Sequence, residues 1–191
     1  MFDIDQLVAD CRACLTEAEP RRAIKETLTR AVADPSSITA ALPPDVAGIT
    51  LHHQSDDLTV LEAVWAPGMR LYPHDHQMWA CIGIYAGQED NEFFRRPPDR
   101  RPGLVESGGK QLRVGDVTLL GSDTIHAVTN PLGGVTAAIH VYGGDFVSQP
   151  RSQWLEPAQV EEAYDLDRTR RVFADANAAW QGSTVRGTEV S

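Results

Sequence analysis

The sequence predicts an all-β core, a barrel or a sandwich, flanked by helices at both ends. The chain has 191 residues, of which 42% are hydrophobic, so a single domain with a sizeable core is expected. From residue 48 onward, short runs of β-branched and aromatic residues alternate with Gly, Pro, Asp and Asn, which is typical of many-stranded sandwiches and barrels. These runs cover residues 58–65, 78–86, 91–96, 111–114, 116–120 and 135–142.

Helical periodicity separates the two ends of the chain from this β-rich region. In residues 1–44 apolar side chains recur at helical spacing, so we expect a helical segment that packs on the barrel, with a break at Pro35. Residues 45–155 are expected to form the barrel that carries the site. A polar loop bracketed by Pro97-Pro98 and Gly108-Gly109 is expected to lie outside it. Residues 156–191 are expected to form a C-terminal helix and tail of the same domain.

The net charge restricts the binding partners of the protein, and the cysteine content restricts its cellular compartment. With 27 acidic and 17 basic residues the net charge is −10, which argues against a nucleic acid or an anionic membrane surface as the main partner. No apolar run approaches the ~20 residues that span a bilayer, and the N-terminus does not resemble a signal peptide. Three cysteines argue against a disulfide framework and indicate a reducing environment. We therefore expect a cytoplasmic monomer or small homo-oligomer that acts on a small molecule.

Three histidines form a candidate metal site. His74 and His76 are two residues apart, so on an extended segment both imidazoles point to the same face. His126 follows a Gly-Ser-Asp turn at the end of a later strand, and closure of a barrel brings two such segments together. Three neutral imidazoles on one face hold a metal ion and leave positions open for substrate. The alternative is that His74 and His76 are surface histidines beside a proline turn.

The stretches around these histidines resemble the two conserved motifs of cupin proteins. The resemblance covers about residues 45–155, and it implies a double-stranded β-helix barrel with a metal site inside. The residues that match the two motifs are Gly68, His74, His76, Gly115, His126 and Asn130.

One departure from the usual first motif resembles the thiol dioxygenase branch of the cupins. The usual motif has a glutamate ligand four or five positions after its second histidine, where this chain has Ala80 and Cys81. Members of that branch bind Fe(II) with three histidines. The resemblance therefore implies an iron site formed by His74, His76 and His126. From the residues alone, three histidines equally suit Zn, Ni, Co or Mn.

A later strand resembles the outer-sphere relay of the same branch. The family carries Ser-x-His-x-Tyr, and this chain has Ala138, His140 and Tyr142, which alternation places on one face of a strand. Family members of the mammalian type also have a cysteine seven residues after the first ligand, which can become cross-linked to the tyrosine. Cys81 occupies that position here. The resemblance thus implies catalytic roles for His140, Tyr142 and Cys81, although simple alternation puts Cys81 on the opposite face from His76 unless a bulge intervenes.

Substrates of this family carry a carboxylate that an arginine holds. Arg151 stands nine residues after Tyr142, as in the 3-mercaptopropionate dioxygenases, and a guanidinium can hold a carboxylate through two hydrogen bonds. Arg95 and Arg96 are competing candidates. The alternative for Arg151 is a surface arginine after a proline.

The resemblance implies a non-haem Fe(II) dioxygenase that oxidises a small thiol carboxylate, 3-mercaptopropionate-like or cysteine, with O₂ to the sulfinate. Three uncharged ligands leave the metal charge uncompensated, so an anionic thiolate is the expected ligand. Ala138, which replaces the relay serine, keeps a second hypothesis open, namely a metal-binding cupin without turnover, such as a sensor. A cupin enzyme of other chemistry, such as a dioxygenase that cleaves carbon–carbon bonds, is a third.

Overall fold

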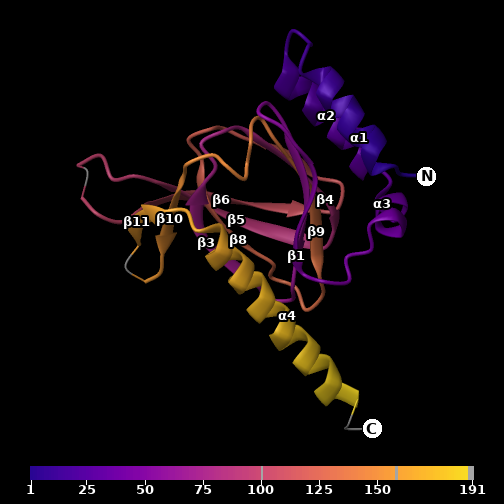
Figure 1. Ribbon diagram of the computed structural model, residues 1–191. Coiled ribbons are helices and arrows are strands. Elements are labelled where there is room, and N and C mark those ends of the chain that lie inside the picture. Colours follow the sequence, from indigo (N-terminus) through magenta and orange to yellow (C-terminus); the bar gives the residue numbers. More distant parts are fainter. Residues whose placement is uncertain (100, 158, 189–191) are drawn as a thin grey trace.

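Two antiparallel sheets face each other and enclose the core of the protein (Figure 1). The computed structural model describes residues 1–99, 101–157 and 159–188. The strands are β1 (Gly48–Gln54), β2 (Thr59–Trp65), β3 (Arg70–Asp75), β4 (Ala80–Ala86), β5 (Gln88–Arg95), β6 (Val105–Arg113), β7 (Val117–Leu120), β8 (Ile125–Thr129), β9 (Thr136–Tyr142), β10 (Ser152–Leu155) and β11 (Val160–Ala163). The helices are α1 (Ile4–Cys14), α2 (Pro20–Val32), α3 (Pro35–Ala41) and α4 (Leu166–Thr188).

The strand order is that of a double-stranded β-helix. One sheet has the order β1-β2-β9-β4-β7 and the other the order β11-β10-β3-β8-β5-β6. From β2 to β9 the chain behaves like a long hairpin that has been wound up, because β2 pairs with β9, β3 with β8, β4 with β7 and β5 with β6. This winding is the jelly-roll arrangement of cupins. The predicted all-β core, a cupin barrel with helices at both ends, is therefore confirmed.

Alternation along the strands divides the apolar residues into an inner and an outer cluster. The inner cluster fills the barrel and includes Ile82 of β4 and Tyr142 of β9. The outer cluster lies between the first sheet and the N-terminal helices, where Leu28 of α2 packs with residues of β4 and β9. Helices α2 and α3 contact β4, and α4 contacts β1 and buries Phe173 in the inner cluster. The helices thus cover one sheet and one end of the barrel (Figure 1).

The helical ends differ in detail from the predicted ones. The predicted break separates α2, which ends at Val32, from α3, which was not predicted as a separate helix. Helix α3 begins directly at Pro35, because Pro occupies the first turn and the Asp34 carboxylate accepts a hydrogen bond from the Ser37 backbone N–H at 3.2 Å. After residue 155, where the sequence predicts a helix, the short strand β11 comes first, whereas β10 lies within the predicted barrel range. Helix α4 then continues to residue 188, and residues 189–191 of the predicted tail lie outside the described residues.

The predicted polar loop after β5 is shorter than expected, because β6 already begins at Val105. Gly108 and Gly109 do not close the loop but lie within β6, where Gly108 pairs with Phe93 of β5 beside an irregularity in the ladder. Gly108 has a φ of +119°, a conformation that side chains rarely adopt, so a glycine is required there. Strand β6 lies at the edge of its sheet and is mostly exposed, which explains why its sequence has no alternation of apolar and polar residues.

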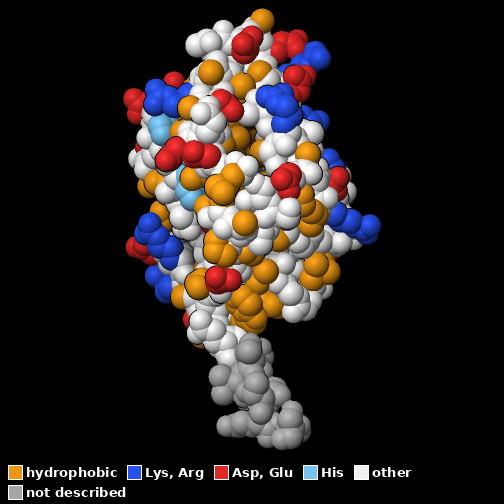
Figure 2. All heavy atoms as spheres, turned by 90° about the vertical axis from the view of Figure 1, so that its right-hand side faces the viewer, with side chains coloured by type: hydrophobic (Ala, Val, Ile, Leu, Met, Phe, Trp, Pro, Cys, Tyr) orange, Lys and Arg blue, Asp and Glu red, His pale blue; other side chains and the backbone are white. Residues whose placement is uncertain are grey.

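The outer surface carries charges of both signs. Figure 2 shows acidic and basic side chains interspersed with small apolar areas over the face that bears the N-terminal helices. Within the described ranges, no helix combines the length and the apolar composition needed to cross a membrane.

We expect Gly83 in β4 to be essential for the docking of α2. A Cβ at this position would lie 2.8 Å from Leu28 Cγ and 3.0 Å from Val32 Cγ1, so α2 approaches the sheet more closely than any larger residue permits. Gly83→Val should lower the free energy of unfolding by about 1–3 kcal/mol through overpacking, measured by urea denaturation. Gly133→Val is the control, since a Cβ there meets nothing within 4 Å. Equal stabilities of the two variants would contradict this view of the interface.

Candidate metal centre

The winding of the barrel brings the three predicted ligands together. His74 of β3 and His126 of β8 are direct cross-strand partners. His76 follows the end of β3, and Gln77 after it adopts a φ of +54°, which turns the chain away from the sheet. The residue between the two histidines, Asp75, points elsewhere, because its carboxylate accepts hydrogen bonds from the Ser152 backbone N–H and the Gln77 side chain. Alternation along β3 thus separates the ligands from an anchoring carboxylate.

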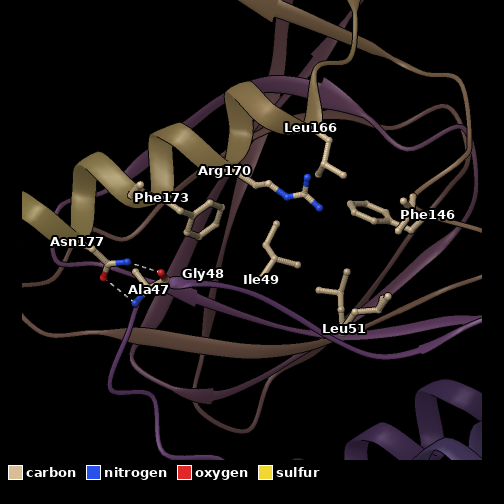
Figure 3. Close-up of a pocket in the computed structure, with 12 residues that line it drawn as sticks. Ala47, Gly48, Ile49, Leu51, Phe146, Leu166, Arg170, Phe173 and Asn177 are labelled. Carbon is tan, nitrogen blue, oxygen red and sulfur yellow. Dashed lines mark hydrogen bonds between the residues drawn. The ribbon is translucent and has the colours of Figure 1, made fainter.

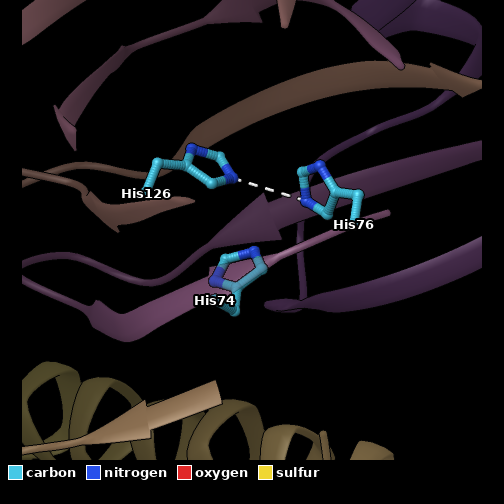
Figure 4. Close-up of side chains that lie close together, drawn as sticks. All are labelled: His74, His76 and His126. Atoms are coloured by element: carbon cyan, nitrogen blue, oxygen red, sulfur yellow. Dashed lines mark hydrogen bonds between the residues drawn. The ribbon is translucent and has the colours of Figure 1, made fainter. Parts of the chain in front are cut away.

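The imidazoles converge on one point inside the barrel. One nitrogen from each of His74, His76 and His126 lies within 4.8 Å of the others, and all three side chains are buried. The Nε2 atoms of His76 and His126 are 3.4 Å apart (Figure 4). The predicted His₃ group is therefore present as a spatial cluster.

Hydrogen bonds behind two of the rings fix which nitrogen faces the centre. The Nδ1 of His74 lies 3.0 Å from the Tyr72 carbonyl oxygen, and the Nδ1 of His126 lies 2.7 Å from Asn91 Oδ1. Since both partners are acceptors, each Nδ1 carries the proton and each Nε2 presents a lone pair. Metal-binding histidines in proteins usually have such a partner on the other nitrogen.

Burial keeps the three imidazoles neutral. Desolvation lowers the pKa of His74 to about 4, with the charge of Arg151 acting in the same direction. Desolvation also lowers the pKa of His76 and of His126 well below the ordinary value, and the neighbouring histidines add to the effect. The neutral form is the one that binds a metal ion, so no protons need to leave before a metal ion binds near neutral pH.

The donor set fits a divalent transition metal. Three neutral nitrogens suit Fe, Co, Ni, Cu or Zn, and they leave coordination positions open. In the part of the chain that the structure describes, the cluster that can hold a metal contains these histidines and no carboxylate. A divalent ion would therefore keep its full charge in a buried cavity, which favours an anionic ligand.

The His140–Tyr142 pair of β9 lies beside this centre. The Nδ1 of His140 is 2.9 Å from the Tyr142 hydroxyl oxygen, and the Tyr142 ring packs edge-on against His76 with centroids 5.0 Å apart. Burial raises the pKa of Tyr142, so its hydroxyl stays protonated. Ala138, which precedes the pair on the same face, is fully buried and has no side-chain group to donate.

Two buried polar residues of β5, Glu89 and Asn91, form part of the site and were not predicted. Asn91 bonds to His126, and Glu89 accepts a hydrogen bond from Trp65 Nε1 at 2.8 Å and lies 3.6 Å from His140 Nε2. Their spacing places both on the inner face of β5. The sequence signal is weak, because β5 begins Gln-Glu-Asp-Asn-Glu and resembles a solvent-exposed strand.

Arg151 lies close enough to the centre for its charge to lower the pKa of His74 and His76. Its side chain is buried between the rings of Phe146 and Tyr164, with the guanidinium carbon 4.1 and 3.9 Å from their centroids. Nη1 donates to the carbonyl oxygens of Phe146 and Gln149. Nε and Nη2 are buried and have no hydrogen-bond partner among the described residues. The site therefore contains two free donors on a permanent cation.

The other two arginine candidates lie elsewhere. Arg95 is exposed at the end of β5. Arg96 pairs with Glu161 at 2.6 Å and with Asp75 at 3.5 Å, and its guanidinium carbon lies 5.0 Å from the ring centroid of Trp154. Arg95 is thus solvent-exposed and Arg96 is paired with two carboxylates, so neither is a buried guanidinium with unpaired donors like Arg151.

Cys81 does not belong to the site. It is fully buried in the outer cluster with Cys11, whereas its neighbours Ala80 and Ile82 face the interior with Tyr142. The catalytic role that the resemblance implied for Cys81 is therefore wrong, because β4 shows no bulge at this position and Cys81 pairs in register with Val141. The same register keeps its thiol on the opposite face from Tyr142, so the cross-link that was left open is not supported. Burial raises the pKa of its thiol to about 12.

The cavity at the centre is small, and a larger one adjoins it. About 30 Å³ is free among the histidines, His140, Tyr142 and Phe146, which is room for a water molecule or two. A second, mostly apolar cavity of about 280 Å³ lies between α4 and β1. Figure 3 shows Phe146 and Ile49 in it, with the Arg170 side chain reaching across from α4. Ile49, Leu61 and Phe146 line both cavities and form the wall between them.

Comparisons with known proteins extend only to the fold. No protein-family model matches the chain. The structure is similar to the DMSP lyase DddQ from Ruegeria pomeroyi DSS-3, with 18% sequence identity and a TM-score of 0.43 over 56% of this chain and 51% of that one. It is also similar to a cupin superfamily protein from Desulfitobacterium hafniense DCB-2, with 14% identity and a TM-score of 0.44 over 56% of this chain and 88% of that one. The chain thus spans about half the length of the DMSP lyase it matches.

A third similar structure is a protein with a double-stranded β-helix domain from Klebsiella pneumoniae subsp. pneumoniae MGH 78578. It shares 13% identity and a TM-score of 0.42 over 53% of this chain and 75% of that chain. At these identities the likeness concerns the barrel fold and assigns no activity to the chain.

We expect the metal-free protein to lose stability as the pH falls. The folded-state pKa of His74, about 4, lies below its ordinary value of 6.5, so the unfolded state binds more protons between these values. Stability should therefore fall with pH through this window, by about 2 kcal/mol at pH 5 from His74 alone. Urea unfolding of the metal-free chain near pH 7 and pH 5 measures the loss. His74→Gln should reduce it, and an unchanged pH dependence in that variant would contradict the assignment.

Proposed function

We propose that the protein is an Fe(II)-dependent thiol dioxygenase that oxidises a small thiol carboxylate with O₂ to the sulfinate. The observation that carries this proposal is a buried three-histidine cluster without a carboxylate ligand, adjacent to the unpaired donors of Arg151. His140 and Tyr142 complete the constellation on the inner face of β9. The resemblance of these residues to the thiol dioxygenases supports the same activity.

The charge of the site favours a thiolate substrate. The three ligands are neutral, and in the described residues no carboxylate joins the cluster. Fe(II), when bound, would supply the positions for the thiolate and for O₂ and the electrons that activate O₂. Arg151 lies within electrostatic reach, since its charge lowers the pKa of both His74 and His76. The metal ion and Arg151 would thus supply positive charge near the reacting sulfur, and no carboxylate of the described residues is part of the ligand cluster.

Arg151 is the residue that would bind the substrate carboxylate. Its Nε and Nη2 are adjacent donors in the plane of the guanidinium, which match the two oxygens of a carboxylate. The rings of Phe146 and Tyr164 hold the guanidinium on both faces, so the donors are oriented before the substrate arrives. A carboxylate at Arg151 and a sulfur at the histidines require a short linker, which favours 3-mercaptopropionate or cysteine over larger thiols.

The Tyr142 hydroxyl would make the remaining polar contact with the substrate. Its ring lines the cavity with His74 and His76, and His140 fixes the direction of the hydroxyl by a hydrogen bond of 2.9 Å. The apolar wall of Ile49, Leu61 and Phe146 excludes bulk water from these groups. Excluding water strengthens each electrostatic contact in the cavity.

A second candidate function is metal binding without turnover, as in a sensor. The free volume of about 30 Å³ favours it, because a thiol carboxylate does not fit unless the wall residues move. In that case the metal would bind a small anion or water. The apolar cavity between α4 and β1 would then stay closed off from the metal centre by Ile49, Leu61 and Phe146.

Oxygen uptake separates the two candidates. Protein loaded with Fe(II) under anaerobic conditions and then mixed with 3-mercaptopropionate or cysteine should consume O₂ and form the sulfinate in equal amounts. His126→Ala, which removes one ligand, should bind no iron and show no uptake. Full iron occupancy without uptake on a panel of small thiols would reject the dioxygenase and favour the sensor.

A charge-specific change in substrate selectivity should identify the role of Arg151. Arg151→Met keeps much of the packing between Phe146 and Tyr164 but removes the donors, so kcat/KM for 3-mercaptopropionate should fall roughly 10- to 100-fold. Activity on cysteamine, which has no carboxylate, should change little. Arg95→Met is the matched control, since Arg95 is exposed at the end of β5. Equal losses on both thiols would mean that Arg151 only stabilises the segment between β9 and β10, through its hydrogen bonds to Phe146 and Gln149.

A further inference from the structure

Glu89 is a buried acidic side chain that the proposed reaction does not use. It is 0% exposed, and it lies on the inner face of β5 among apolar residues. Its Oε1 accepts one hydrogen bond, from Trp65, and its Oε2 has no partner within the described part of the chain. Burying a carboxylate with so few partners is strongly unfavourable, so a charge or a donor nearby must compensate.

His140 is the group that faces Glu89. Its Nε2 lies 3.6 Å from Glu89 Oε1 and has no hydrogen-bond partner, while its other nitrogen, Nδ1, bonds to Tyr142. The two nitrogens of one ring thus connect a buried carboxylate to the hydroxyl beside the metal ligands. Ala138, at the position of the family's relay serine, contributes nothing to this chain.

We propose that Glu89 is a positioning residue that replaces the missing serine and holds the proton of His140 on Nε2. With the proton there, Nε2–H points at a carboxylate and is attracted by it. With the proton on Nδ1, the Nε2 lone pair would face the carboxylate and be repelled. A neighbouring carboxylate is a common means by which proteins select one histidine tautomer.

The tautomer decides what the Tyr142 hydroxyl can do. If His140 Nδ1 is unprotonated, it is an acceptor, and the hydroxyl at 2.9 Å must donate to it. The phenolic oxygen then presents only lone pairs to the cavity. In terms of the proposed function, on which this step rests, Tyr142 can accept a hydrogen bond from a donor such as the amine of cysteine, and it does not donate to the thiolate or to the carboxylate of the substrate.

Trp65 keeps the carboxylate in place. Its indole N–H donates to Oε1, the same oxygen that faces His140, and its ring packs against Phe173 of α4 with centroids 5.2 Å apart. Glu89 is therefore held by Trp65 of β2, which in turn packs against α4. Through its contact with Glu89, the His140 ring is oriented by the same elements. This arrangement parallels the acid–histidine pairs that orient an imidazole in hydrolases.

The tautomer can be measured without metal or turnover. Nitrogen NMR of the metal-free full chain, labelled with ¹⁵N-histidine and assigned with His140→Gln, distinguishes protonated from unprotonated ring nitrogens. We expect His140 to be protonated on Nε2 and not on Nδ1. The reverse pattern in the wild-type chain would overturn the proposal.

Two variants separate the carboxylate from the packing around it. Glu89→Met keeps the length of the side chain and removes both oxygens, so His140 should become a mixture of tautomers. Trp65→Phe removes the indole donor but leaves the carboxylate, so the Nε2–H form should persist. An unchanged His140 spectrum in Glu89→Met, or the same change in both variants, would refute a specific role for Glu89.

The iron-loaded enzyme gives a second, independent readout. Glu89→Met should lower kcat for 3-mercaptopropionate about 10- to 100-fold with little change in KM, as is usual for residues behind an active-site histidine. If the predicted tautomer is found but no thiol is oxidised, the proposed function fails while the role of Glu89 stands. If thiols are oxidised at the wild-type rate by Glu89→Met, the role of Glu89 fails alone.

Discussion

The pairing of β3 with β8 is the interaction on which the site depends. It sets His74 directly opposite His126, and the turn after β3 adds His76 to the same cavity. None of these histidines is stabilised by burial, because each loses water and gains at most one hydrogen bond behind the ring. The free energy that holds them together comes from the two apolar clusters and the ladders of the wound hairpin.

The sequence predicted those parts of the site that alternation along a strand determines. The fold and the cluster of His74, His76 and His126 followed from spacing and from the resemblance, and both are present in the structure. The same alternation refutes a role for Cys81, which the family pattern suggested. A match in residue spacing transfers between proteins only if the register of the strand is the same, and here Cys81 pairs with Val141 on the outer face.

Other parts of the site depend on pairings between distant strands and were not visible in the sequence. Glu89 and Asn91 lie in a polar stretch that resembles an exposed strand, and only the packing of β5 against β8 and β9 turns them inward. Arg151 was one of three arginine candidates. Its stacking between Phe146 and Tyr164 distinguishes it, because a buried guanidinium with free donors contrasts with the ion-paired Arg96.

The contact between Trp65 and Phe173 has a consequence for how the protein is made. Phe173 belongs to α4, the last helix of the described residues, and Trp65 bonds to Glu89 behind His140. During translation the three ligand histidines leave the ribosome well before α4. The metal-binding residues can therefore meet before the relay behind them is complete. A nascent chain stalled before α4 should bind metal but leave Trp65 and Glu89 unsupported, so that maturation of the site ends with the docking of this helix.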